Sequence, residues 1–260
     1  MPATDHPVAP PPGALLLLEG RALLELGAYG ASLPWLRTAP RGDGHPVMVL
    51  PGLSASDLST RPMRSFLIEL GYAAHGWGLG RNVGGRGVID QFLVPRLAEL
   101  HRRHGRKLSL VGWSLGGILA RELAKRSADH VRSVITLGSP FAGGPGATNV
   151  GRLFETLSGR RLHDDPWIRR RLAEPPPVPT TSIFSRSDGV VAWQACVQSP
   201  APFTENIEVR GSHCGLGHHP AALYAVADRL AQPEGGWRPF APSGLTGRLY
   251  RLMTSGSAPP

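Results

Sequence analysis

The chain has 260 residues, with 28 basic and 19 acidic side chains, which give a formal net charge of +9. Its length suits one large α/β domain, and its recurring aliphatic runs exclude a disordered chain. Apart from Lys107 and Lys125, the basic residues are arginines. They do not interleave with aromatic residues, so we expect solvated arginine-rich surfaces and no nucleic-acid partner. No apolar run approaches the ~20 residues of a membrane span, and no signal peptide is recognised, so we expect a cytoplasmic protein.

Residues 1–40 are predicted to form a separate N-terminal segment. Residues 1–13 are rich in proline. The leucines of Ala14–Leu36 recur at mixed i, i+3 and i+4 spacings, which predicts an amphipathic helix. Such a helix could make a peripheral contact with a membrane, but packing on the domain is the favoured interpretation.

Residues 41–232 alternate predicted strands with predicted helices. The strands are Pro46–Leu50, Ala73–Leu79, Leu108–Val111, Val131–Pro140, Thr180–Ser185 and Asn206–Arg210. The helices are Thr60–Leu70, Val88–His104, Leu115–Arg126 and Ala221–Leu230. This alternation predicts a parallel sheet with helices on both faces. Residues 141–178 break the rhythm and are predicted to form a small cap or lid, and residues 233–260 an irregular tail.

The most informative motif is G-x-S-x-G at Gly112–Gly116, between a predicted strand and a predicted helix. This setting is typical of a serine held on a sharp turn with its hydroxyl exposed, so Ser114 is the candidate nucleophile. The turn needs glycines because side chains there would collide with neighbouring backbone. Leu115 follows at a helix N-terminus, where its N–H could stabilise an oxyanion. The alternative is an ordinary strand–helix turn in which Ser114 only caps the helix.

A serine nucleophile needs a base, and the base needs an acid that fixes its tautomer. Asp188 lies in the turn after a predicted strand, and His213 lies in the loop after the next one. Asp188 could instead serve only as a turn residue. His218 and His219 are rival bases, although His219 precedes Pro220 and is more typical of a helix N-terminus.

A second oxyanion donor is expected in the loop after the first strand. Pro51-Gly52-Leu53 occupies this position, so the Leu53 N–H is the candidate. Three tryptophans near the predicted loops could line a substrate pocket or equally pack in the core: Trp77, Trp113 and Trp193.

The chain has two cysteines, which are too few for a metal site or a disulfide framework. Cys196 lies beyond Asp188, and Cys214 directly follows His213. A disulfide between them would tie the acid loop to the base loop. Two reduced cysteines are the equally weighted alternative.

Five segments together carry a resemblance to a known family: Leu50–Thr60 (LPGLSASDLST), His75–Gly84 (HGWGLGRNVG), Gly112–Gly117 (GWSLGG), Ser185–Val191 (SRSDGVV) and Gly211–Pro220 (GSHCGLGHHP). In this order they resemble the α/β-hydrolase superfamily, specifically small bacterial serine esterases and lipases. The resemblance implies an α/β-hydrolase fold with Ser114 as nucleophile, His213 as base and Asp188 as acid, and no metal or organic cofactor. Pro51 stands where many lipases have histidine, which leaves the Leu53 donor intact but weakens any close substrate analogy.

The expected function is therefore that of a serine carboxylic-ester hydrolase acting on a small-molecule or lipid ester. Two alternatives use the same three residues, namely an acyltransferase and a lactonase. A non-catalytic binding protein with a hydrolase fold is a third alternative, although all three residues are present.

Overall fold

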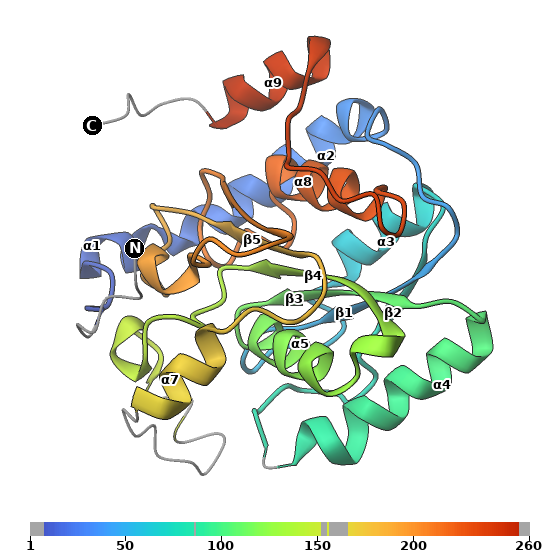
Figure 1. Ribbon diagram of the computed structural model, residues 1–260. Helices are drawn as coiled ribbons and strands as arrows, with labels where there is room; N and C mark the ends of the chain where they lie inside the picture. The colour runs from blue at the N-terminus through green and yellow to red at the C-terminus, as the bar shows by residue number, and fades with distance from the viewer. Residues whose placement is uncertain (1–7, 86, 152–154, 156–165, 255–260) are drawn as a thin grey trace.

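The computed structural model describes residues 8–85, 87–151, 155 and 166–254. Within these residues, six strands form one sheet of order β2-β1-β3-β4-β5-β6, in which every neighbouring pair is parallel (Figure 1). The strands are β1 (Pro46–Leu50), β2 (Ala73–Gly76), β3 (Leu108–Trp113), β4 (Val131–Leu137), β5 (Thr180–Phe184) and β6 (Thr204–Glu208). The predicted parallel sheet is confirmed.

Helices cover both faces of this sheet, as predicted (Figure 1). Val47 and Val49 of β1 belong to a core shared with α3 (Arg61–Glu69) and α8 (Pro220–Leu230). Met48 and Leu50 belong to a second core, shared with α4 (Val94–His104) and α5 (Leu115–Arg126). Alternate side chains of a strand point to opposite faces, so uninterrupted apolar strands are the pattern of a sheet buried on both sides.

Two predicted strands end three residues earlier than expected, at Gly76 and Leu137, and each has a local cause. The strand from Ala73 ends at Gly76 because the N–H groups of Trp77 and Gly78 donate instead to the Asp57 carboxylate, at 3.0 and 3.1 Å. The strand from Val131 ends at Leu137 because Gly138 has a φ of +55°, a left-handed conformation that interrupts an extended chain.

Two helical predictions also change. The predicted helix Val88–His104 opens with a π-helical turn, η2 (Ile89–Leu93), before α4. The expectation of an irregular tail is wrong for Gly244–Thr254, which form α9. This helix packs on the domain through Tyr250, whose ring is buried and lies 5.0 Å from the ring of Phe240.

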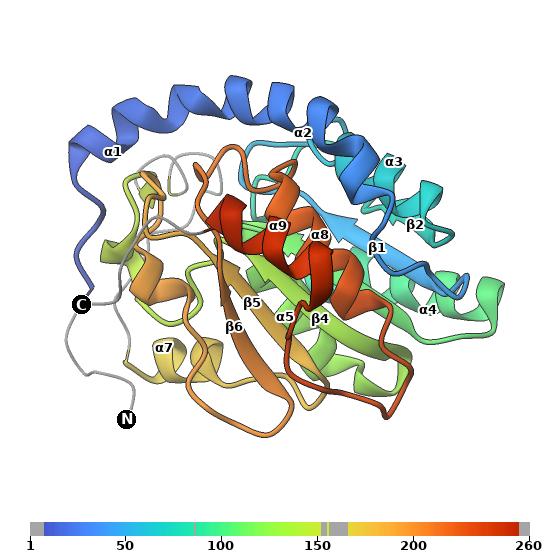
Figure 2. The same cartoon turned by 90° about the horizontal axis from the view of Figure 1, so that it is seen from above.

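The N-terminal segment forms a nearly continuous helical run along one side of the molecule (Figure 2). It consists of α1 (Gly13–Leu17), the 3₁₀ turn η1 (Leu18–Arg21) and α2 (Ala22–Leu36), which we call the N-terminal strap. A helix was expected here, and its C-terminal end packs on the domain as the favoured interpretation predicts, with Leu36 buried and Trp35 stacked on Tyr224 at 5.0 Å. The leucines of its N-terminal half, in contrast, face solvent. Leu17 is 86% exposed, and Leu23 and Leu24 are each 78% exposed, whereas Glu19 is 9% exposed. In this half the acidic side chains, and not these leucines, contact the domain, because Glu19 and Glu25 bind its backbone amides, as detailed below.

The predicted cap is described in part, by the 3₁₀ turn η4 (Pro145–Ala147) and α7 (Pro166–Ala173). Most of the helical fragment expected at Gly151–Leu157 lies outside the described residues. Arg121 of α5 is 1% exposed, and its guanidinium donates to the carbonyls at the end of α7, including that of Glu174 at 2.9 Å. The cap is thereby attached to the helix that follows the candidate nucleophile.

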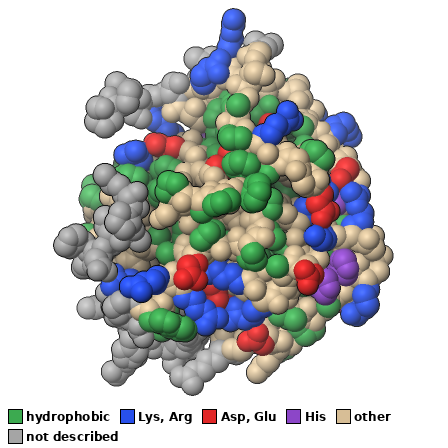
Figure 3. All heavy atoms as spheres, in the orientation of Figure 1, with side chains coloured by type: hydrophobic (Ala, Val, Ile, Leu, Met, Phe, Trp, Pro, Cys, Tyr) green, Lys and Arg blue, Asp and Glu red, His purple; other side chains and the backbone are tan. Residues whose placement is uncertain are grey.

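Charged side chains of both signs are interspersed on the face drawn in Figure 3. Exposed ion pairs include Arg37–Glu69 at 2.6 Å, Arg96–Glu99 at 2.7 Å and Arg186–Glu208 at 3.0 Å. Among the described residues, no helix combines the length and the apolar character that crossing a membrane requires.

Candidate functional site

Ser114 lies on the sharp turn between β3 and α5. Its backbone has φ 54° and ψ −121°, a conformation that is strained for any residue with a side chain. The N–H of Ser114 donates to the carbonyl of Leu137 at 2.8 Å, which attaches the turn to the end of β4. The side chain of Ser114 makes no capping hydrogen bond to α5. Ser114 is therefore a half-buried residue on a tight turn, and it does not act as a helix cap.

The glycines of the motif are required by close backbone contacts. A Cβ atom on Gly112 would lie 2.4 Å from the carbonyl oxygen of Gly116. A Cβ atom on Gly116 would lie 2.4 Å from the carbonyl oxygen of Leu50 in β1. Backbone atoms cannot move aside cheaply, so the strand, the turn and the helix fit together only with glycine at both positions.

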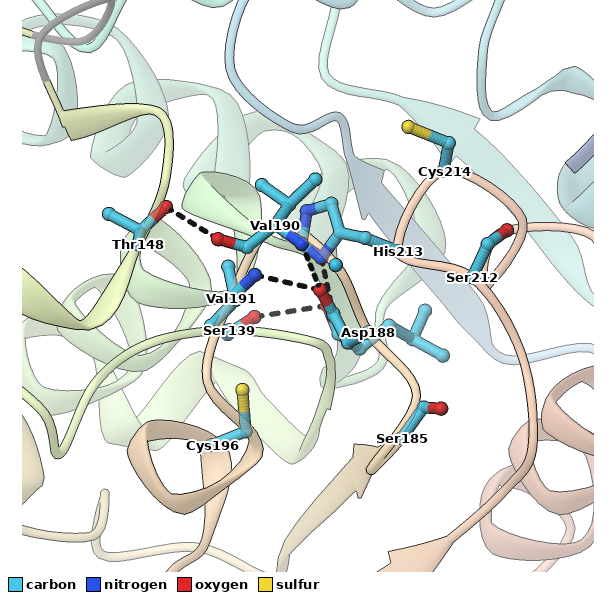
Figure 4. A network of polar contacts seen from close by, with 12 residues as sticks. Ser139, Thr148, Ser185, Asp188, Val190, Val191, Cys196, Ser212, His213 and Cys214 are labelled. Carbon is cyan, nitrogen blue, oxygen red and sulfur yellow. Dashed lines mark hydrogen bonds and ion pairs between the residues drawn. The ribbon is translucent and has the colours of Figure 1, made fainter. Parts of the chain in front are cut away.

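Asp188 and His213 form a buried pair on the loops that follow β5 and β6 (Figure 4). The Nδ1 atom of His213 lies 2.7 Å from Oδ2 of Asp188, and the two residues are 6% and 3% exposed. The other carboxylate oxygen of Asp188 accepts the N–H groups of Val190 and Val191, at 2.8 and 2.7 Å. Asp188 is thus both a turn residue and the partner of the imidazole, and its carboxylate is fixed from two sides.

The surroundings of His213 favour its protonated form. Burial lowers the pKa of the imidazole, but the carboxylates of Asp188 and Glu19 outweigh this effect, so the pKa of His213 lies above its ordinary value. Because Asp188 binds Nδ1, a neutral imidazole carries its proton there and leaves Nε2 free to accept one.

The turn that carries Ser114 lies against this pair. Trp113, the residue before Ser114, donates its indole N–H to the carbonyl of His213 at 3.1 Å. Gly138 follows the carbonyl that binds the Ser114 N–H, and a Cβ atom on it would lie 3.1 Å from His213 Nδ1 and 3.2 Å from Asp188 Oδ2. Within the described part of the chain, Ser114 Oγ has no hydrogen-bond partner, so the structure pairs His213 with Asp188 but does not join Ser114 to His213 by a hydrogen bond.

The loop after β1 reaches the same place. A Cβ atom on Gly52 would lie 3.3 Å from Cβ of Ser114, so this backbone is in contact with the serine. The next residue is Leu53, the candidate oxyanion donor. Among the described residues, the backbone N–H groups of Leu53 and Leu115 donate no hydrogen bond. That these amides serve as oxyanion donors stays a prediction.

Asn82 fixes this loop and was missed by the sequence reasoning. It is fully buried, and its Nδ2 atom donates to the carbonyl of Pro51 at 2.7 Å. Its backbone also exchanges hydrogen bonds with Ser54 and Ala55, at 2.7 and 2.8 Å. Asn82 lies within His75–Gly84, a segment singled out from the sequence, but a buried side-chain contact leaves no local pattern.

The rival histidines are engaged elsewhere. His218 contacts the carbonyl of Ala22 in the N-terminal strap at 3.0 Å. His219 precedes α8 as its N-cap residue, as its place before Pro220 predicts. Of these candidates, His213 is the one that contacts Asp188.

The three tryptophans have different surroundings. Trp77 is 2% exposed and packs in the core beside α4, so it does not line a pocket. Trp113 joins the Ser114 turn to the His213 backbone. Trp193 stacks on Phe184 at 5.8 Å, and the Arg186 guanidinium lies 4.1 Å from its ring centre.

Cys196 and Cys214 are both free, so the disulfide weighed from the sequence is not formed. Cys196 is buried, with its thiol 3.8 Å from the carbonyl of Ala192. Figure 4 shows the two cysteines on opposite sides of the Asp188–His213 pair. Burial and then the carboxylate of Glu19 raise the pKa of Cys214 to about 12, so its thiol is neutral near pH 7.

A second set of His, Asp and Ser side chains lies elsewhere in the fold, where its serine is fully buried. His45 lies 2.5 Å from Asp43 through Nδ1 and 3.0 Å from Ser109 Oγ through Nε2. Both His45 and Ser109 are fully buried, and burial lowers the pKa of this imidazole. They lie at the start of β1 and β3, away from the loops after the strands. We interpret this set as structural, because no substrate can reach its serine.

Known proteins resemble this chain in sequence motif and in fold. A family model described as the alpha/beta hydrolase fold matches residues 99–188, which include Ser114 and Asp188. Aspergillus fumigatus lipase B is similar in structure, with a TM-score of 0.58 at 16% identity. The chain has the α/β-hydrolase fold. The fold that the resemblance implies is thereby confirmed, whereas membership of the superfamily and the bacterial attribution stay predictions.

Other proteins with this fold are similar over most of their length. The mature form of Bacillus licheniformis lipase BlEst2 has 16% identity and a TM-score of 0.54, covering 75% of this chain and 94% of that chain. A putative aryl esterase from Burkholderia cenocepacia has 17% identity and a TM-score of 0.50, covering 74% and 93%. The match to Aspergillus fumigatus lipase B covers 76% of this chain but 55% of that chain. No curated protein sequence matches the chain. At these identities the comparisons establish the fold and support a hydrolase in general terms.

Proposed function

We propose that this α/β-hydrolase-fold protein is a serine hydrolase that cleaves carboxylic esters through an acyl-enzyme. The observation that supports this most strongly is the buried Asp188–His213 pair, which the Trp113 indole joins to the strained Ser114 turn and which lies against Gly138 at the end of β4. The three residues occur in the chain order nucleophile, acid, base, and they follow β3, β5 and β6 of the parallel sheet.

The proposed reaction has two halves. Ser114 Oγ attacks the ester carbonyl while His213 Nε2 takes the hydroxyl proton, and Asp188 stabilises the resulting imidazolium. The N–H groups of Leu53 and Leu115 hold the oxyanion. The tetrahedral adduct collapses, and His213 gives its proton to the departing alcohol. Water then attacks the acyl-enzyme, with His213 again acting as base, which releases the acid and restores Ser114.

The test is hydrolysis of p-nitrophenyl esters from acetate to palmitate by the wild type and by Ser114→Ala. Loss of the serine should reduce kcat by about 10⁶-fold, to the background rate. Ser199→Ala, at an exposed serine, is the matched control and should retain full activity. No ester turnover by the wild type, or equal turnover by Ser114→Ala, would refute the proposal. An added alcohol acceptor and a lactone panel distinguish an acyltransferase or a lactonase from an esterase.

The outward leucines of the N-terminal strap favour a lipid surface as a partner. Six leucines of the strap are exposed: Leu16, Leu17, Leu18, Leu23, Leu24 and Leu26. A helix that presents an apolar face to solvent while its acidic side chains point inward suits burial in the headgroup region of a bilayer. We propose that this face brings the active site to ester substrates held in lipid.

Co-sedimentation with phosphatidylcholine–phosphatidylglycerol vesicles tests this contact. Leu17→Ser and Leu23→Ser should each lower the partition coefficient about tenfold, because each removes one inserted leucine. Ile68→Ser changes an exposed apolar residue of α3 and should not alter binding. Absence of wild-type binding at low salt, or equal binding by the Leu17 and Leu23 variants, would contradict the proposal.

A further inference from the structure

Glu19 of the N-terminal strap binds both loops of the candidate site. Its Oε1 atom accepts the N–H of Gly189, next to Asp188, at 2.8 Å and the N–H of His213 at 2.9 Å. Its Oε2 atom accepts the N–H of Cys214 at 2.8 Å. One carboxylate therefore joins the backbone of the acid loop (residues 185–191) to that of the base loop (residues 211–219).

Two further charged residues of the strap also bind these loops, Glu25 the base loop and Arg21 the acid loop. Glu25 accepts the N–H and the hydroxyl of Ser212, at 2.8 and 2.5 Å. Arg21 donates to the carbonyl and hydroxyl oxygens of Ser187, at 2.6 and 3.0 Å, and lies 3.4 Å from Glu25. The two loops are thus held by side chains from a segment more than 150 residues away in the sequence.

Glycines in the two loops permit this close approach. A Cβ atom on Gly189 would lie 2.2 Å from the carbonyl oxygen of Leu15 in α1. A Cβ atom on Gly215 would lie 1.5 Å from the carboxylate of Glu25. The strap and the loops therefore fit each other closely, and this contact is not a loose covering.

Glu19 stays ionised in this position. Burial opposes its charge, but the three backbone N–H groups and the nearby His213 together hold the pKa of the carboxyl below its ordinary value. The groups around His213 are Asp188 at Nδ1, the Glu19 carboxylate beneath its backbone N–H, the neutral thiol of Cys214 and the Trp113 indole on its carbonyl. Glu19 is thus a second negative charge that favours the imidazolium.

We propose that Glu19 is a positioning residue of the active site. Its one carboxylate holds the Asp188 loop and the His213 loop in fixed positions relative to each other. The N-terminal strap then belongs to the catalytic unit. The kinetic consequences rest on the esterase function proposed above, whereas the positioning itself does not.

Kinetics of Glu19→Ala, Glu19→Gln and Glu69→Ala test the catalytic consequence. Glu19→Ala should lower kcat about 10- to 100-fold with little change in KM, because Glu19 binds the backbone of the loops that carry the acid–base pair and not the substrate. Glu19→Gln keeps one acceptor oxygen but no charge, so it should retain more activity, and the acidic limb of its kcat/KM profile should move to lower pH. Glu69 of α3 pairs with solvent-exposed Arg37 at the other end of the strap, so Glu69→Ala is the matched control and should match the wild type.

Hydrogen-exchange mass spectrometry of the same variants tests the positioning without any substrate. Peptides covering residues 188–191 and 211–217 should exchange faster in Glu19→Ala and Glu19→Gln than in the wild type or Glu69→Ala. Faster exchange together with an inactive wild type would uphold the positioning and refute only the esterase. Unchanged exchange in both loops, or an unshifted pH limb and unchanged kcat in an active enzyme, would overturn the proposal. If Glu19→Ala does not fold, Glu19→Gln supplies both measurements.

Discussion

At the scale of single residues, the role of Asp188 depends on two separate sets of hydrogen bonds. One oxygen binds backbone amides, and the other binds His213. In Asp188→Asn the amide can still accept the backbone N–H groups, but its NH2 would face Nδ1 and favour the wrong tautomer of the imidazole. We predict that kcat falls by about 10⁴-fold while the melting temperature changes little. Steady-state kinetics and thermal unfolding measure both, and a variant with near-normal kcat would exclude Asp188 as the orienting acid.

The protonation of His213 sets a second prediction at this scale. Its pKa in the folded protein lies above the ordinary value of 6.5, because Asp188 and Glu19 outweigh burial. The base works only when neutral, so kcat/KM should rise with pH along an acidic limb centred above pH 6.5. The raised pKa also stabilises the fold below pH 6.5, and this contribution is lost as pH rises through the folded pKa. An acidic limb centred below pH 6 would contradict the assignment.

At the scale of secondary-structure elements, the Ser114 turn depends on the contact between β3 and α5. A Cβ atom on Gly112 would lie 2.4 Å from Gly116 O and from Gly117 Cα, so we predict that Gly112→Ala destabilises the protein by about 3 kcal/mol. Gly27 in α2 has no atom within 4 Å of its added Cβ, so Gly27→Ala should instead stabilise by about 0.5–1 kcal/mol. Denaturant unfolding measures both values. Equal effects would show that the turn is not tightly packed.

The elements that the sequence predicts well are those whose pattern is local. The alternation of apolar runs predicts all six strands and the main helices, because burial on both faces requires continuous apolar residues. The motif Gly112–Gly116 also identifies the candidate nucleophile from a local pattern, because close packing of the turn requires glycine at both ends. The N-terminal strap illustrates the limit. Its leucine spacing predicts a helix but not which face is buried, because the decisive contacts of Glu19 lie far away in the sequence.

Asn82 and the end of β2 show the same limit on a smaller scale. Asn82 holds the loop after β1 through a buried side chain, and Asp57 ends β2 by accepting two backbone N–H groups. Neither contact belongs to a periodic pattern. The Asp188–His213 pairing was predictable, because the carboxyl ends of neighbouring parallel strands meet at one edge of a sheet and leave few candidate residues there.

At the scale of the whole molecule, the stability of the fold at low pH should depend on Glu19 of the N-terminal strap, which contacts both loops of the candidate site. Glu19 has a depressed pKa in the folded state, so it stabilises the fold above its ordinary value of 4.5, and this contribution is lost as pH falls through the folded pKa. We predict that Glu19→Gln is less stable than the wild type at pH 7, and that the difference shrinks below pH 4.5. Denaturant unfolding across pH 3–7, with Glu69→Gln as control, measures this. A pH-independent difference would contradict the ionised Glu19.

The most direct test of the whole account is labelling with a fluorophosphonate, followed by peptide mass spectrometry. The reagent forms a covalent adduct with a serine that is activated by a histidine base and does not depend on the natural substrate. We predict one adduct per chain, on Ser114, absent from Ser114→Ala and formed much more slowly by Asp188→Asn. An unlabelled wild type, or an adduct on another serine, would contradict the assignment of Ser114, His213 and Asp188 as one catalytic unit.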